Sequence, residues 1–113
     1  MASVVVLTGP AGAGKNTVAV ELTKQLDHLA VIDGDDVRQM VRQPHKAPWE
    51  GEAGATQHEL GVQNNCSLAR SFVKAGYDVL ILDVVSQNLV STYRRELSSF
   101  PCFIVSLLPS REV

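Results

Sequence analysis

Hydrophobic residues alternate along the chain between short continuous runs and longer stretches with helical spacing. Continuous apolar runs predict buried strands at residues 3–8, 30–33, 77–83 and 102–108. Apolar positions three or four residues apart predict helices at residues 15–29, 35–43, 56–75 and 86–98. Because strands and helices alternate, we expect βαβ units with right-handed crossovers. The predicted fold is α/β, a three-layer sandwich around a parallel sheet.

The pattern also predicts where two helices end and where a loop lies. Pro44 is expected to end the second helix, and Gly76 the third. Residues 44–55 between these helices contain the only tryptophan, Trp49, and are predicted to form a surface loop. One stripe of the third helix consists of Leu60, Asn64, Leu68 and Phe72.

Length and composition narrow the class of protein. A chain of 113 residues predicts a single domain, residues 1–113, with one hydrophobic core. The net charge of −2 argues against a broad basic surface for nucleic acid or an anionic membrane. No apolar run approaches the roughly 20 residues of a membrane span, and no basic segment of a signal peptide precedes the first strand.

The two cysteines, Cys66 and Cys102, lie in apolar segments without the spacing of a metal site. We interpret both as small buried residues in a reducing environment, so a cytoplasmic location is expected. The sequence carries no signal for the oligomeric state.

The turn after the first strand carries the strongest chemical signal. Residues 9–15 follow the pattern GxxxxGK, in which glycines let backbone N–H groups curl around a phosphate and the lysine reaches the β- and γ-phosphates. A glycine-rich turn without a ligand is the alternative, but the strand before the loop and the helix after it favour a nucleotide, most simply ATP. The candidate nucleotide contacts are Gly9, Ala11, Gly12, Ala13, Gly14, Lys15, Asn16 and Thr17.

Asn16 departs from this pattern, which has Ser or Thr after the lysine. The hydroxyl at that position ligates Mg²⁺, and an amide oxygen is also a hard ligand, although it is aimed differently. We therefore predict Asn16 as a candidate metal ligand, with nucleotide binding kept and metal placement altered.

An acidic turn follows the second strand. Asp33, Asp35 and Asp36 are followed by Arg38, and phosphoryl transfer uses carboxylates to serve a metal and to orient the acceptor hydroxyl. The alternative is helix capping, with Asp35 as the N-cap and Arg38 on a solvated face. The phosphate loop upstream favours the catalytic interpretation, because the carboxyl ends of parallel strands meet at one edge of the sheet.

Asp83 ends the third apolar strand, as the acidic residue of a Walker B strand does when it contacts Mg²⁺. It is the second candidate metal ligand. His45, Lys46 and Trp49 are candidates to face the acceptor, although an ordered surface loop explains them almost as well. His28 and His58 are interpreted as solvated helix residues.

These motifs together resemble the P-loop small-molecule kinases, nearest to adenylyl-sulfate kinase and chloramphenicol phosphotransferase-like proteins. The segment from Ile32 to Arg38 is similar to the Asp-Gly-Asp-x-x-Arg segment of adenylyl-sulfate kinase. The resemblance implies a P-loop NTPase fold and transfer of a phosphoryl group from ATP, with Mg²⁺, to a hydroxyl of a small acceptor. By it Lys15, Asp33 and Asp35 would be catalytic, and Arg38 would contact the acceptor.

The chain departs from this family in length as well as at Asn16. Family members continue past the fourth strand into an arginine-bearing lid helix, a fifth strand and an adenine-contacting loop, and this chain stops at Val113. We therefore expect it to lack these parts, as a fragment or as a reduced protein. The alternative function is a catalytically impaired nucleotide-binding module. A GTPase is disfavoured because the sequence has no Asn-Lys-x-Asp motif and no DxxG switch.

Overall fold

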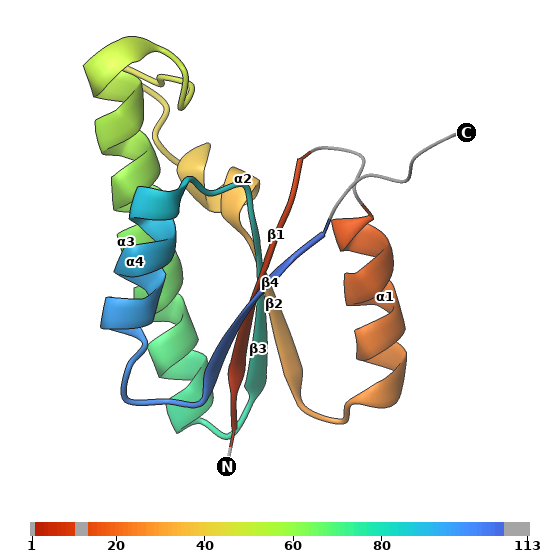
Figure 1. Cartoon of the computed structure of the whole chain (residues 1–113). Coiled ribbons are helices and arrows are strands. Elements are labelled where there is room, and N and C mark those ends of the chain that lie inside the picture. Colours follow the sequence, from red (N-terminus) through yellow and green to blue (C-terminus); the bar gives the residue numbers. More distant parts are fainter. Residues whose placement is uncertain (1, 11–13, 108–113) are drawn as a thin grey trace.

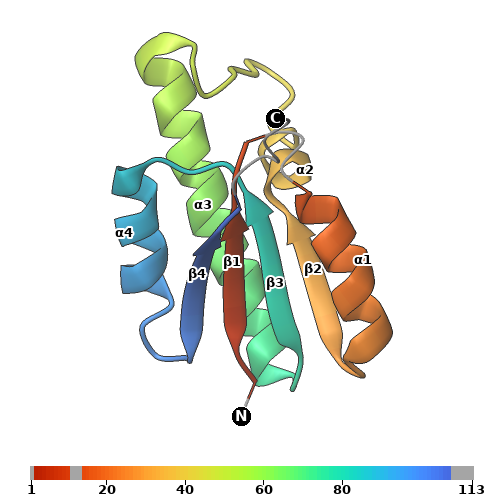
Figure 2. The same cartoon turned by 45° about the vertical axis from the view of Figure 1, so that its right-hand side comes forward.

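The four predicted strands form one parallel sheet in the order β2-β3-β1-β4. This computed structural model describes residues 2–10 and 14–107. Figure 2 shows the strands side by side, with the two edges formed by β2 and β4. The strands are β1 (Val4–Thr8), β2 (Leu29–Asp33), β3 (Asp78–Asp83) and β4 (Cys102–Ser106).

Helices cover both faces of the sheet, as predicted for a three-layer sandwich. Helix α1 (Lys15–Gln25) lies on one face, and α3 (Gly51–Lys74) and α4 (Gln87–Glu96) lie on the other (Figure 1). The short helix α2 (Gly34–Arg38) follows β2 directly. Because side chains alternate along a strand, Val4 and Val6 pack towards α3 and α4 while Leu7 packs towards α1. Burial on both faces explains the continuous apolar runs.

The strand register brings the predicted acidic residues to one edge of the sheet. Thr8 is opposite Asp83 in the pairing of β1 with β3, and Asp33 is opposite Leu82 in the pairing of β2 with β3. The carboxyl ends of three neighbouring strands therefore meet at one place.

Three helix boundaries differ from the sequence prediction by more than two residues. Helix α1 ends at Gln25 rather than at residue 29, because Leu29 pairs with Asp78 and starts β2. Helix α2 ends at Arg38 rather than at residue 43, where exposed residues such as Met40 add no core contact to favour another turn. Helix α3 starts at Gly51 rather than at residue 56, so the predicted loop is shorter.

The start of α3 depends on close contact with the loop before it. The Ala47 N–H donates to the Glu50 carboxylate at 2.6 Å, and Glu50 is the N-cap of the helix. A Cβ at Gly54 would lie 2.0 Å from the Ala47 carbonyl oxygen, so only glycine fits there.

The buried face of α3 is not the predicted stripe. Leu60 and Leu68 are 48% and 41% exposed, and Phe72 is also exposed. The residues of this helix that pack on the sheet are smaller: Val62, Asn65, Cys66 and Ala69. Val62, Cys66 and Ala69 pack in one core cluster with residues of the strands and of α4, whereas Leu60 and Leu68 stay exposed.

The two cysteines differ in burial. Cys66 is fully buried, and this burial raises the pKa of its thiol to about 12, so the thiol stays protonated. Cys102 is half-buried, and partial burial also raises the pKa of its thiol. Within residues 2–10 and 14–107, no helix has the length and apolar character that crossing a bilayer requires.

Candidate functional site

A pocket of about 440 Å³ lies at the carboxyl ends of β1, β2 and β3. We call it the strand-end pocket. It brings together most of the described residues that the sequence singles out for nucleotide and metal binding. Its lining consists of Pro10, Gly14, Lys15, Asn16, Thr17, Asp33, Asp35, Leu82, Asp83 and Val84. Of the predicted phosphate contacts, Ala11, Gly12 and Ala13 lie outside the described residues.

Gly14 connects the loop to α1 with a backbone that favours glycine. Its φ of 96° lies in the left-handed region, which side chains with a Cβ rarely adopt. Helix α1 begins at the next residue, so the first N–H groups of the helix face the same end of the sheet as the pocket.

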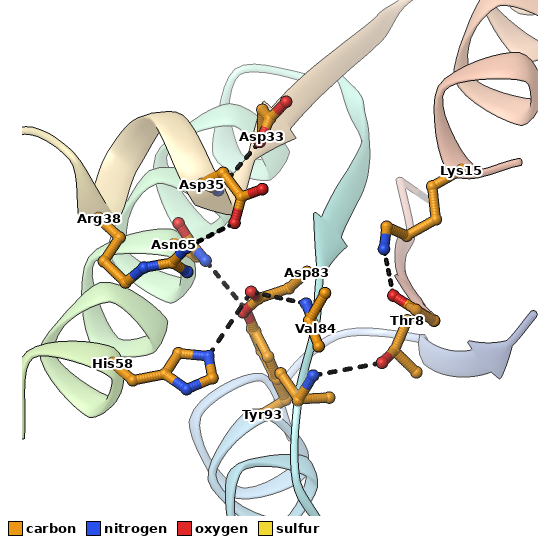
Figure 3. A network of polar contacts seen from close by, with 12 residues as sticks. Thr8, Lys15, Asp33, Asp35, Arg38, His58, Asn65, Asp83, Val84 and Tyr93 are labelled. Carbon is orange, nitrogen blue, oxygen red and sulfur yellow. Dashed lines mark hydrogen bonds and ion pairs between the residues drawn. The ribbon is translucent and has the colours of Figure 1, made fainter. Parts of the chain in front are cut away.

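The Lys15 ammonium group is folded back onto the loop. Nζ donates to the carbonyl oxygens of Gly9 and, at 3.3 Å, of Pro10. Figure 3 shows this side chain on the opposite side of β3 from Arg38 and His58. The loop carbonyls therefore hold the cation at the wall of the strand-end pocket.

The acidic turn caps a helix and also lines the pocket. Asp33 is the N-cap of α2, and its carboxylate accepts the Asp35 N–H at 2.9 Å. The sequence alternative placed the cap at Asp35, which is the wrong residue. Asp35 instead accepts from the Arg38 guanidinium at 2.8 Å. Capping therefore does not exclude either carboxylate from the pocket, because both line it.

Arg38 is not among the residues that line the strand-end pocket. Its side chain is mostly buried and lies between Asp35 and α3, where the Cβ position of Gly61 is 3.8 Å from the Arg38 Cβ. The Nε atom is buried without a hydrogen-bond partner in the described part of the chain.

Gly34 lets α2 begin directly against the end of β3. A Cβ at this position would lie 2.8 Å from the Leu82 carbonyl oxygen and 2.9 Å from the Asp83 carboxylate. The Asp-Gly-Asp spacing therefore has a structural reason, because a side chain here would push the two strand ends apart.

Asp83 is buried, and both of its carboxylate oxygens have partners. Oδ2 accepts from the Tyr93 hydroxyl at 2.6 Å, and Oδ1 accepts from the Val84 N–H at 2.9 Å. Asn65 Nδ2 donates to the same Tyr93 oxygen at 2.9 Å (Figure 3). Burial, followed by the charge of Asp83, raises the pKa of Tyr93 far above its usual value, so its hydroxyl stays protonated and donates.

His58 is the clearest functional candidate that the sequence interpretation missed. It was expected to be a solvated helix residue, which is wrong, because its side chain is only 13% exposed. Its Nε2 atom lies 3.7 Å from Asp83 Oδ1 and has no hydrogen-bond partner among the described residues (Figure 3). The spacing of His58, Val62, Asn65 and Ala69 is the helical signal that would have found it.

The oxygen atoms in the strand-end pocket suit a hard cation. Asn16, Asp33, Asp35 and Asp83 provide amide and carboxylate oxygens, the ligand types that Mg²⁺ prefers. Across residues 2–10 and 14–107, no three His, Cys, Asp or Glu side chains cluster closely enough to hold a metal. This arrangement fits Mg²⁺, which proteins usually bind through one or two carboxylates together with substrate phosphates.

The sequence matches the model of a known protein family. A family model described as an AAA domain matches residues 5–110. The chain belongs to this AAA domain family. No curated protein matches it.

Solved structures show the same fold at low sequence identity. An APS kinase from Mycobacterium tuberculosis has a TM-score of 0.76 and 18% identity, over 95% of this chain and 76% of that one. A hexameric APS kinase from Thiobacillus denitrificans has a TM-score of 0.70 and 18% identity, over 100% of this chain and 24% of that one. A chain of the Pnkp1/Rnl/Hen1 RNA repair complex has a TM-score of 0.70 and 17% identity, over 94% and 33%.

These similarities confirm the predicted P-loop kinase fold and the resemblance to the adenylyl-sulfate kinase group. The chain spans about three quarters of the first of these structures and a third or less of the other two.

Proposed function

We propose that this chain binds ATP in the strand-end pocket and transfers its γ-phosphoryl group to a hydroxyl of a small-molecule acceptor. The observation that carries the proposal is the shared lining of this pocket. Lys15 and Asn16 from the glycine-rich loop, Asp33 and Asp35 from the acidic turn, and Asp83 from β3 all line it. Phosphoryl transfer requires a cation for the phosphates and carboxylates for the metal and the hydroxyl at one place.

In this proposal the loop of residues 9–15 and the start of α1 hold the phosphates. Backbone N–H groups at the start of a helix bind anions, and the helix dipole adds positive potential. Lys15 releases the loop carbonyls of Gly9 and Pro10 and donates to the β- and γ-phosphates instead. Thr17, which also lines the pocket, adds a hydroxyl donor.

Asn16 and Asp83 are the proposed ligands of Mg²⁺. When bound, Mg²⁺ neutralises phosphate charge as the phosphoryl group is transferred. Asp83 contributes through the outward side of its carboxylate, because Tyr93 and Val84 hold its oxygens in a fixed orientation. Asp33 and Asp35 orient the metal's water molecules and the acceptor hydroxyl. Arg38 does not line the strand-end pocket and acts through Asp35, which its guanidinium holds in place.

Substitution at the pocket tests this proposal through ATP turnover with Mg²⁺ and a panel of small alcohols. We expect Lys15→Ala and Asp35→Asn each to lower acceptor phosphorylation by about 100-fold or more, because each removes a group that acts on the transferred phosphate or the hydroxyl. Asp36→Asn is the matched control, since Asp36 is exposed on α2 and does not line the pocket. Equal turnover in all four proteins would contradict the assigned roles.

A second candidate function, a nucleotide-binding module without catalysis, is favoured by two observations. Asn16 stands where the metal-ligating hydroxyl of the loop pattern belongs. Both oxygens of Asp83 already accept hydrogen bonds from within the chain. The variant Asn16→Ser distinguishes the two functions, because a gain in turnover supports the kinase, whereas ATP binding with no turnover in either protein supports the module.

The proposed partners are a nucleotide and a small acceptor, and the proposed location is the cytoplasm. The nucleotide and acceptor follow from the pocket lining, and the net charge of −2 argues against nucleic acid or an anionic membrane as a partner. The free thiols suit a reducing compartment.

A further inference from the structure

Three buried polar side chains form a line from α3 through α4 to the end of β3. Asn65 Nδ2 donates to the Tyr93 hydroxyl oxygen at 2.9 Å, and the Tyr93 hydroxyl donates to Asp83 Oδ2 at 2.6 Å (Figure 3). The exposed fractions of Asn65, Tyr93 and Asp83 are 1%, 0% and 3%. Of the three, only Asp83 lines the strand-end pocket. Asn65 and Tyr93 can therefore affect a molecule in that pocket only through Asp83.

The chemistry of the three groups fixes the direction of both hydrogen bonds. An ionised carboxylate only accepts, so the Tyr93 hydroxyl gives its single proton to Asp83. Asn65 must then present its amide nitrogen, because the Tyr93 oxygen has no second proton to donate. Each donor therefore acts on the next group in one direction, from α3 to the end of β3.

Stability of the core alone does not explain why Asn65 is polar. Its Oδ1 atom is buried and has no hydrogen-bond partner in the described part of the chain. Its neighbours on the buried face of α3 are apolar or weakly polar: Val62, Cys66 and Ala69. Replacing a buried hydrogen-bonded pair by apolar groups of similar shape is often neutral or stabilising. What the Asn65–Tyr93 contact does supply is a fixed orientation of the Asp83 carboxylate.

Tyr93 leaves one oxygen of Asp83 for a cation. Oδ2 accepts the Tyr93 hydroxyl from the buried side. Oδ1 accepts the Val84 N–H at 2.9 Å and lies beside the start of α2, 2.9 Å from the Cβ position of Gly34. His58 Nε2 lies 3.7 Å from the same Oδ1. A cation in the strand-end pocket therefore meets Asp83 through Oδ1 alone.

A carboxylate that offers one oxygen distinguishes between the two common hard cations. Ca²⁺ takes about six to eight oxygen ligands and accepts both oxygens of one carboxylate. Mg²⁺ is smaller and demands octahedral geometry, into which the narrow angle of a two-oxygen contact fits poorly. Occupation of Oδ2 by Tyr93 therefore removes a contact that Ca²⁺ can use and Mg²⁺ does not need.

We propose that Tyr93, held by Asn65, is a positioning residue that restricts Asp83 to one oxygen and thereby favours Mg²⁺ over Ca²⁺ in the strand-end pocket. Asn65 acts through Tyr93, and Tyr93 acts through Asp83. This inference rests on the proposed function, in which Asp83 is a ligand of Mg²⁺, and adds the choice of cation to it.

The test is the affinity for ATP with either Mg²⁺ or Ca²⁺ as the only divalent cation, measured by calorimetric titration. The unmodified protein should bind ATP more tightly with Mg²⁺. Tyr93→Phe removes only the hydroxyl, and the ratio of the affinity with Mg²⁺ to that with Ca²⁺ should fall by about ten-fold, as is common when a partner of a metal ligand is lost.

Asn65 and Tyr93 should behave as one unit. Asn65→Leu should lower the same ratio, and the double variant with Tyr93→Phe should lower it no further than Tyr93→Phe alone, because the two residues act in series. The double variant also replaces both polar groups by apolar ones, so no buried donor is left unpaired and the fold is kept.

Thr92→Val is the matched control, because it also removes a buried hydroxyl from α4. The Thr92 hydroxyl donates only to the Asn88 carbonyl oxygen of its own helix, at 3.4 Å, in the described part of the chain. This variant should keep the cation ratio of the unmodified protein. A ratio that falls equally in Thr92→Val would overturn the inference, since loose packing of α4 would then be the cause.

The remaining outcomes separate this inference from the proposed function. A preference for Mg²⁺ that Tyr93→Phe leaves unchanged would overturn the inference and leave the proposed function standing. The same ATP affinity with Mg²⁺, with Ca²⁺ and with neither cation in the unmodified protein would contradict Asp83 as a metal ligand and overturn both. A ratio that falls in Tyr93→Phe, in a protein that phosphorylates no alcohol, would support the inference and contradict the phosphotransferase.

Discussion

Asp83 shows most clearly what single residues contribute to this site. Its carboxylate lines the strand-end pocket, yet the Tyr93 hydroxyl and the Val84 N–H hold its oxygens from the buried side. Because a buried carboxylate without partners would be costly, these hydrogen bonds let a charged group lie at the end of β3. They also fix its direction, which matters for a group that is to contact a metal or its water molecules.

A substitution at Gly34 tests how closely α2 packs against the end of β3. We expect Gly34→Ala to destabilise the protein by about 1–3 kcal/mol, because the new Cβ would meet the Leu82 carbonyl oxygen at 2.8 Å and the backbone must shift. The measurement is the free energy of unfolding from denaturant titration.

Gly61→Ala is the matched control for that variant. Its Cβ would meet the Arg38 Cβ at an ordinary 3.8 Å, so the better helix propensity of alanine should stabilise the protein by up to about 1 kcal/mol. Equal effects of the two variants would contradict the close packing of α2 on β3.

At the scale of the elements, α3 does more than cover the sheet. Two of its residues, His58 and Asn65, reach the buried contacts of Asp83 and Tyr93 from the same face of the helix. Val62, between them, and Ala69, one turn further along, pack in the hydrophobic core on the same face. The helix therefore contributes both to the core and to the surroundings of Asp83.

Two substitutions test which face of α3 contributes most to the stability of the protein. We expect Val62→Ala to cost about 2 kcal/mol, because Val62 is fully buried and its loss leaves a cavity. Leu68→Ala should change the free energy of unfolding by less than about 0.5 kcal/mol, since Leu68 is 41% exposed. Thermal or denaturant unfolding of both variants checks this, and the reverse order of effects would contradict the orientation of the helix.

Prediction from the sequence worked best where the signal was local. The strands were found because both faces of the sheet are buried, and the edge that joins Lys15, Asp33 and Asp83 follows from parallel strands alone. The buried face of α3 was not identified because the most apolar stripe of this helix contains Leu60 and Leu68, whereas the core contains the smaller Val62, Cys66 and Ala69.

Contacts between distant segments explain the rest of what was missed. The Tyr93–Asp83 and Asn65–Tyr93 hydrogen bonds join α4, β3 and α3, and no spacing within one segment indicates them. The roles of the site residues, and the prediction that residues 1–113 form one domain, stay predictions.

At the scale of the whole molecule, the fold brings the candidate site residues together at the carboxyl ends of the strands. One parallel sheet with helices on both faces (Figure 2) brings three strand ends together at the strand-end pocket. The APS kinase structures share this fold. The central proposal for this chain is that the strand-end pocket holds the phosphates of ATP.

Calorimetric titration with ATP tests that claim most directly. Lys15→Ala should weaken ATP binding by about 10- to 100-fold, because it removes a charge-assisted hydrogen bond to the phosphates. Lys24→Ala on the same helix is the matched control, since Lys24 is exposed and pairs only with Glu21 in the described part of the chain, and it should bind ATP like the unmodified protein. Unchanged affinity in Lys15→Ala, or no ATP binding by the unmodified protein, would contradict the account.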